Sequence, residues 1–165
     1  MTAKVILALL IQFSLLPDDP RLPELARVLA KYPKAQIIEL IGIMIKETGI
    51  RMDVVSSSEC VCWTQQQYGE EHEKPSKEAL RSNTELCITE TIEDLAYWKE
   101  WCGPRYLDAY WKGWSHCTAG KYYVKYKDDP KRKKKWCHGP KCTAYTQEVR
   151  ANERKVRKAL KRREK

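Results

Sequence analysis

Residues 22–55 read LPELARVLAKYPKAQIIELIGIMIKETGIRMDVV and contain the clearest structural signals of the chain. The first part of this stretch predicts a short helix. Leu25, Ala26 and Leu29 recur at helical spacing and form one apolar face. Pro23 suits a first helical position, where its missing N–H would have no partner within the helix. We therefore expect a helix that packs this apolar face inward.

A prolyl turn separates that helix from a second one. The residue before Pro33 is pushed out of the α region, so the first helix ends there and Pro33 opens the next. The second helix has a broad apolar face at spacings of three and four. That face consists of Ile37, Ile38, Ile41, Met44 and Ile45. Gly49 follows the last periodic residue, where helices often end in the left-handed conformation, and residues 50–55 predict an extended strand.

These features resemble the winged helix-turn-helix family. The resemblance covers roughly residues 4–66. It rests on the L-A-x-x-L pattern that ends at Leu29, on the turn at Pro33, on the apolar second helix and on the exit at Gly49 into a strand. It implies that the start of the second helix enters the major groove of double-stranded DNA. The chain looks like the small regulators found in archaeal viruses or plasmids.

Two further segments complete the expected winged-helix unit. Residues 50–55 and 60–64 are strand-like and flank the polar residues 56–59, which predicts a β-hairpin, the wing of the family. Residues 5–16 are apolar but, at 12 residues, too short to cross a bilayer, and no small-x-small cleavage site follows them. We expect them to form the first helix of the unit. The expected location is the cytoplasm, or the host cytoplasm for a viral protein, with no membrane partner.

Composition divides the chain into three parts. Residues 1–66 form the expected winged helix-turn-helix domain, residues 67–90 are a polar linker or loop, and residues 91–165 are rich in aromatic and basic side chains. The expected fold class is α+β. A winged helix-turn-helix would be followed by a small helical and β-hairpin unit with a basic C-terminal helix.

The third part predicts both helices and strands. Residues 91–101 read as an amphipathic helix and residues 106–114 as a second, short one. The alternation of residues 121–127 predicts a strand, with residues 132–137 as its hairpin partner, and residues 143–165 predict a helix. The dense aromatic residues of the second short helix are expected to form a core, and their rings are also able to stack on nucleic-acid bases.

The positive charge is concentrated at the C-terminal end. Residues 1–55 carry 7 Lys or Arg and 6 Asp or Glu, and residues 56–100 carry 4 and 10. Residues 101–165 carry 20 and 6, a net charge of +14 within a total of +9. Such a surplus favours a polyanionic partner for this part of the chain.

The predicted DNA contacts follow from the resemblance and from this charge. Lys34 and Gln36 stand in the first turn of the second helix, where Lys can pair with guanine and Gln with adenine. The basic residues of the hairpin and of the C-terminal helix are expected to contact phosphates. The full set is Lys34, Gln36, Lys46, Arg51, Lys121, Lys125, Lys127, Lys131, Arg132, Lys133, Lys134, Arg154, Arg157 and Lys158.

Four of the seven cysteines are candidate zinc ligands. Tetrahedral zinc needs four donors, and Cys102, Cys117, Cys137 and Cys142 supply them. Only the C-x4-C pair is close in sequence, so disulfides between these cysteines are an equal alternative. Zinc is the one cofactor that the sequence suggests.

No catalytic motif is present: the chain lacks a phosphate loop, a G-x-S-x-G and an H-E-x-x-H. We therefore expect a non-enzymatic protein that binds double-stranded DNA, sequence-specifically or generally, and regulates transcription. The alternative is a structural or adaptor protein. In that case Ile41, Met44 and Ile45 would contact a partner protein or a second copy of the chain in a homodimer.

Overall fold

The computed structural model describes residues 1–55, 60–67, 69, 72 and 74–164. Over these residues the protein is all-α, with 69% helix, 1% strand and no sheet or hairpin. The expected α+β fold is therefore wrong. No helix in this part of the chain is long and apolar enough to cross a membrane.

The chain folds into two compact units. The N-terminal unit comprises Met1–Thr91 and Val149–Lys165, and the central unit comprises Ile92–Glu148. These boundaries differ from the expected ones because helices occupy much of the predicted linker. Helix α4 (Lys77–Ser82) lies within it, and helix α5 (Thr84–Cys102) begins there.

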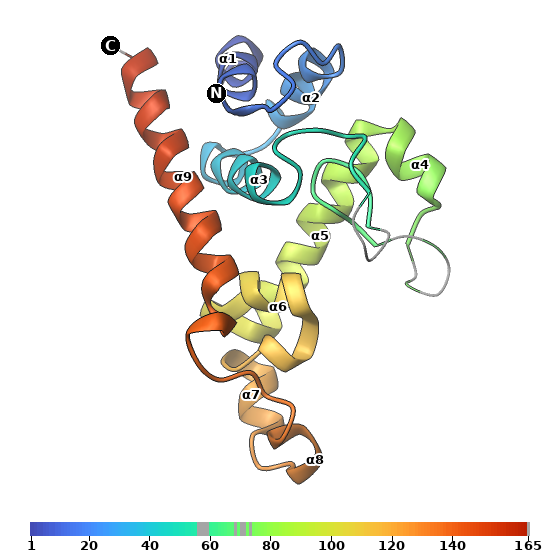
Figure 1. Ribbon diagram of the computed structural model, residues 1–165, viewed down its shortest axis with the longest axis vertical. Coiled ribbons are helices and arrows are strands. Elements are labelled where there is room, and N and C mark those ends of the chain that lie inside the picture. Colours follow the sequence, from blue (N-terminus) through green and yellow to red (C-terminus); the bar gives the residue numbers. More distant parts are fainter. Residues whose placement is uncertain (56–59, 68, 70–71, 73, 165) are drawn as a thin grey trace. The chain divides into compact units, whose positions relative to one another are not determined.

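The three helices predicted for the N-terminal unit are confirmed. They are α1 (Ala3–Phe13), α2 (Leu22–Leu29) and α3 (Lys34–Glu47) (Figure 1). Pro23 lies at the start of α2, and Pro33 is the residue that immediately precedes α3. Gly49 has a φ of +62°, the left-handed conformation expected just beyond a helix end.

Helix α3 is the centre of this unit rather than a surface helix. Every residue from 37 to 44 is buried. The C-terminal helix α9 (Ala144–Arg163) runs past α3 in Figure 1. A Cβ on Gly42 would lie 3.0 Å from Glu153 Cγ and 3.2 Å from the carbonyl oxygen of Val149. The absence of a side chain at Gly42 therefore permits a close crossing of the two helices.

The predicted wing does not form in the described residues. The second strand-like run closes on itself through two hydrogen bonds between the backbones of Val61 and Gln66, at 2.9 and 2.7 Å. A disulfide between Cys62 and Cys87 ties this tight turn to α5. Because the disulfide holds the turn of residues 61–66 against α5, this turn is not available to pair with residues 50–55 as a second strand. The expected tip of the wing, residues 56–59, lies outside the described residues.

The central unit consists of short helices and 3-10 turns around the end of α5. Its elements after α5 are a turn at Gly103–Arg105, α6 (Tyr106–Lys112), a turn at Gly113–His116, α7 (Gly120–Tyr126), α8 (Pro130–Lys133) and a turn at Pro140–Cys142. The two helices predicted for residues 91–101 and 106–114 are confirmed as parts of α5 and α6.

The predicted β-hairpin of residues 121–137 is wrong, because its first strand is helix α7. The rings of Tyr122 and Tyr126, one helical turn apart, have centroids 4.8 Å from each other. In a strand these side chains would stand about 13 Å apart, too far for the rings to touch. The predicted turn is the start of α8, where the Asp129 side chain accepts a hydrogen bond from the backbone N of Lys131 at 2.9 Å.

Aromatic residues form the core of the central unit, but its buried rings, Tyr122 and Trp136, come from the predicted hairpin and not from the predicted helices. Five buried residues make up the cluster, and Trp98, Trp101, Trp114, Tyr123 and Tyr126 pack against it. The buried residues are Cys102, Ala109, Cys117, Tyr122 and Trp136. A disulfide joins Cys102 to Cys117 within this core. Cross-links of this kind stabilise units that are too small to bury a large core.

Candidate nucleic-acid interface

A cavity of about 420 Å³ lies beside α7 and α8. Its lining combines aromatic rings with cationic side chains. The lining residues are Trp114, Ser115, Tyr122, Asp129, Lys131, Arg132, Lys135 and Trp136. All of them belong to the central unit, so the site is built within one compact body. A volume in this range accepts a small planar group together with its polar substituents.

Stacked rings form the aromatic wall of the cavity. The rings of Trp114 and Tyr122 lie with their centroids 3.9 Å apart and their planes at 30°. Trp136 meets Tyr122 edge to face at 5.8 Å. The indole N–H of Trp136 is buried and has no hydrogen-bond acceptor among the described residues. The wall of the cavity is therefore built from packed aromatic rings.

Arg132 joins the aromatic wall to the charged rim. Its guanidinium lies over two rings, 5.2 Å from the centroid of Tyr122 and 3.9 Å from that of Tyr126. Its Nε also lies 3.4 Å from a carboxylate oxygen of Asp129. An anion that enters the cavity would compete with Asp129 for this guanidinium, since both are negatively charged.

The segment that carries the rim is strongly basic. Residues 121–135, here called the α7–α8 segment, contain eight Lys or Arg and two Asp, a net charge of +6. Seven predicted phosphate contacts lie in it, and all but the half-buried Arg132 are exposed. They are Lys121, Lys125, Lys127, Lys131, Arg132, Lys133 and Lys134. Lys121 forms an ion pair with Glu100 at 3.0 Å.

The predicted DNA contacts of the second helix differ in their exposure to solvent and in their partners. Lys34 is exposed at the start of α3 but forms an ion pair with Glu164 at 2.7 Å. Gln36 is half-buried, and α3 is buried from residue 37 to residue 44. Lys46 is exposed, whereas Arg51 is half-buried and donates to the carbonyl oxygen of Thr48 at 3.2 Å. Helix α3 therefore exposes Lys34 and Ala35 at its start and Lys46 near its end, with a buried stretch between them.

The predicted contacts of the C-terminal helix lie on the solvent side of α9. Arg154, Arg157 and Lys158 are exposed. Val156 and Leu160, between and beyond them, are buried. The basic C-terminal helix is thus confirmed as a helix, and it is a packed part of the N-terminal unit.

The four candidate zinc ligands are cross-linked. Cys102 is bonded to Cys117, and Cys137 to Cys142. A sulfur in a disulfide is not the thiolate that zinc requires. The disulfide alternative is therefore the one that the structure shows for these residues.

Six of the eight lining residues are not among the predicted contacts: Trp114, Ser115, Tyr122, Asp129, Lys135 and Trp136. The sequence pattern places Tyr122, Lys135 and Trp136 in a hairpin and Trp114 in a separate helix, so it does not predict that they line one cavity. The helical spacing of Tyr122 and Tyr126 was the signal that would have placed them on one face.

Comparison with protein-family models, curated proteins and solved structures finds no match, so function is inferred from these residues alone.

Proposed function

We propose that this protein binds nucleic acid with its central unit. The lysines of the α7–α8 segment hold the phosphate backbone, and the aromatic cavity takes an unpaired base. The observation that carries the proposal is the cavity itself. Its wall is the stacked pair of Trp114 and Tyr122, and its rim includes Lys131, Arg132 and Lys135.

The charge of the segment supports the phosphate contacts. Exposed lysines that replace the counterions of a nucleic acid gain affinity from counterion release. Within the described part of the chain, Lys127, Lys131, Lys133 and Lys134 have no ion pair that would have to break first. Binding of this kind reads no sequence and falls steeply with salt concentration.

The cavity favours an unpaired base over a duplex. Stacking on aromatic rings or on an Arg plane contributes about 1–3 kcal/mol per base and is available to every base. A base inside a duplex has to be unpaired and turned out before it enters a cavity, which costs a few kcal/mol. Since α3 is buried, the reading of duplex DNA by that helix is not the function that we propose.

The first experiment compares three ligands of one length by fluorescence anisotropy at two salt concentrations: a single strand, a duplex and a single strand without bases. We expect the single strand to bind most tightly. Equal affinity for the strand without bases would contradict the binding of a base in the cavity. Tighter binding of the duplex would contradict the preference for an unpaired base. Absence of binding at low salt would overturn the whole proposal.

The second experiment separates the site from the net charge. K131Q/K135Q should weaken binding and reduce the slope of log affinity against log salt by about 1.4, because each phosphate contact of a single strand contributes about 0.7. K158Q/K161Q on the exposed side of α9 removes the same charge and is the control. If both variants lose the same affinity, the lysines of the cavity contribute only through the net charge of the protein, which would contradict the proposed site.

A third variant should bind more tightly. D129N removes the carboxylate that competes for Arg132, while asparagine remains a good cap for α8. D128N changes an exposed neighbour by the same charge and serves as its control. If D129N gains more affinity for nucleic acid than D128N does, an anion of the ligand binds at Arg132. Equal gains in affinity would count against an anion at that position.

A further inference from the structure

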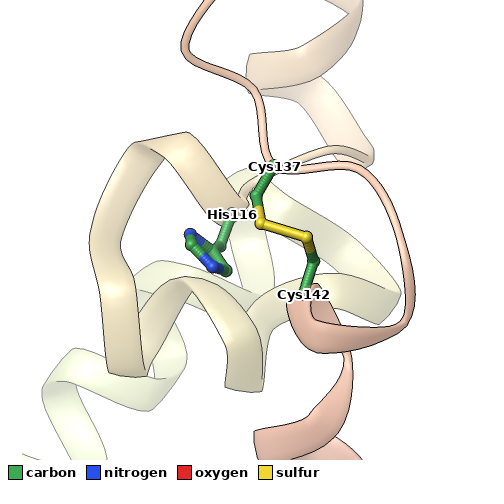
Figure 2. A group of neighbouring side chains, drawn as sticks. All are labelled: His116, Cys137 and Cys142. Atoms are coloured by element: carbon green, nitrogen blue, oxygen red, sulfur yellow. A yellow bond between two sulfur atoms is a disulfide. The ribbon is translucent and has the colours of Figure 1, made fainter.

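Three metal-binding side chains meet in the central unit, next to the cavity but outside it. They are His116, Cys137 and Cys142 (Figure 2). Their candidate ligand atoms all lie within 4.8 Å of one another. Figure 2 shows the imidazole of His116 beside the disulfide that joins the two cysteines.

Contacts other than the disulfide hold these three residues in place. The backbone N of Cys137 donates to the carbonyl oxygen of Ser115 at 2.8 Å, which places Cys137 next to the turn that carries His116. Arg105 Nη2 donates to the carbonyl oxygen of Cys142 at 3.0 Å. Ser115 Oγ lies 3.0 Å from Nδ1 of His116, the kind of outer contact that orients a metal-binding imidazole. None of these contacts depends on the disulfide, so they can persist when it opens.

The chemistry of the set after reduction is that of a zinc site. Two thiolates and one imidazole are donors that Zn²⁺ prefers. With Zn–S distances of about 2.3 Å and a Zn–N distance of about 2.0 Å, tetrahedral geometry places ligand atoms roughly 3.5–3.8 Å apart. The observed clustering is within reach of that spacing. Three protein ligands leave the fourth position to water or to a bound group.

We propose that a dithiol reductant converts the Cys137–Cys142 disulfide into a zinc site completed by His116. The dithiol gives up two hydrogen atoms and becomes a disulfide, and the two cysteines become thiols. When Zn²⁺ binds, both thiol protons leave to solvent and the two thiolates coordinate the metal. The chain then has two states of the same residues, a disulfide under oxidising conditions and a zinc site under reducing ones.

Burial directs the reductant to this disulfide. The four cysteines of the other two disulfides, Cys62, Cys87, Cys102 and Cys117, are 0% exposed. Cys137 is half-buried and is the most exposed of the cross-linked cysteines. Thiol–disulfide exchange requires access of the attacking thiolate to a sulfur atom. Mild reduction should therefore open Cys137–Cys142 first.

The test uses the full chain, reduced with increasing dithiothreitol and desalted without oxygen. Alkylation and mass spectrometry identify the thiols that appear, and Zn²⁺ is titrated against a chromogenic chelator. We expect Cys137 and Cys142 to be the first pair released, with one Zn²⁺ bound per chain only after their release. No zinc binding by the reduced chain, or equal binding by the oxidised chain, would overturn the proposal.

Two histidine variants identify the third ligand without touching the cysteines. Loss of an outer contact to a ligand costs about 10- to 100-fold in metal affinity, so loss of His116 itself in H116A should cost at least as much. H138A is the matched control, because His138 follows Cys137 directly but is exposed and outside the cluster. Equal affinity of H116A and H138A would overturn the assignment of His116. In C137S/C142S the zinc bound after mild reduction should disappear, and zinc that persists would contradict the site.

Discussion

The backbone of Gly120 packs directly against the backbone of Trp101. A Cβ placed on Gly120 would lie 2.6 Å from the carbonyl oxygen of Trp101, closer than any side chain tolerates. Gly120 also has a φ of +75° and begins α7. This contact holds the start of α7 against the end of α5. It thereby fixes the position of Tyr122, which forms the wall of the cavity.

The first prediction concerns this contact. G120A should lower the free energy of unfolding by more than the roughly 1–2 kcal/mol of a left-handed backbone, because the clash is with backbone atoms that cannot move aside. G113A is the control: its φ is +69°, and no described atom lies within 4 Å of its Cβ position. Chemical denaturation followed by tryptophan fluorescence measures both. Equal losses of unfolding free energy in G120A and G113A would mean that the close approach of Gly120 to Trp101 does not constrain the fold.

The second prediction concerns the buried carboxylate of Asp108, which is 0% exposed. It accepts hydrogen bonds from Arg105 Nε at 2.8 Å and from Thr146 Oγ1 at 2.7 Å. D108A removes both hydrogen bonds and leaves Arg105 without its carboxylate partner, which should lower the free energy of unfolding by about 3 kcal/mol. D108N keeps the shape and should lose less. A loss in D108A no larger than in the exposed D128A would contradict this role.

The third prediction is a pH dependence in the N-terminal unit. The hydrogen bond from the Arg21 side chain holds the pKa of Asp19 below its usual value, although burial of the carboxyl opposes this. A lowered pKa means that the stabilisation is complete above the unfolded value of about 4 and is lost as the pH falls through the folded value. D19N should therefore destabilise the protein by about 1–2 kcal/mol near neutral pH.

The difference between D19N and the unmodified protein should shrink in acid. Unfolding curves at a series of pH values below neutral measure it. The exposed neighbour variant D18N is the control and should follow the unmodified protein throughout. A difference that stays constant down to strongly acidic pH would show that the charge of Asp19 is not what Arg21 stabilises.

The fourth prediction tests whether α9 is a structural helix or a dispensable tail. Leu160 is 2% exposed, so L160A should cost about 2–5 kcal/mol of unfolding free energy through the cavity that it creates. K161A changes the next, exposed residue and should stay within about 0.5 kcal/mol. For the same reason, deletion of residues 154–165 should unfold the N-terminal unit as well as remove charge. A truncated chain with an unchanged unfolding midpoint would contradict this.

The helices α1, α2 and α3 of the N-terminal unit follow from local sequence signals. Pro23 and Pro33 act within one or two residues of their own positions, and Gly49 marks the end of α3 through its own backbone conformation. Apolar side chains at spacings of three and four define a helix face without reference to any other segment. These signals are local, so reading them required no knowledge of the rest of the chain.

Which faces are buried, and which cysteines pair, was decided only by the tertiary structure. The apolar face of α3 predicted that one side of the helix is buried. Helix α9, from the C-terminal end of the sequence, packs against α3 at Gly42 and buries more of it. The run at residues 121–127 fits a strand as well as a helix. Contacts of Tyr122 with Trp114 and Trp136 select the helix, because packing against distant rings outweighs a local preference. The cavity follows from those same contacts, since its aromatic wall and its lysines come together only once α7 is helical.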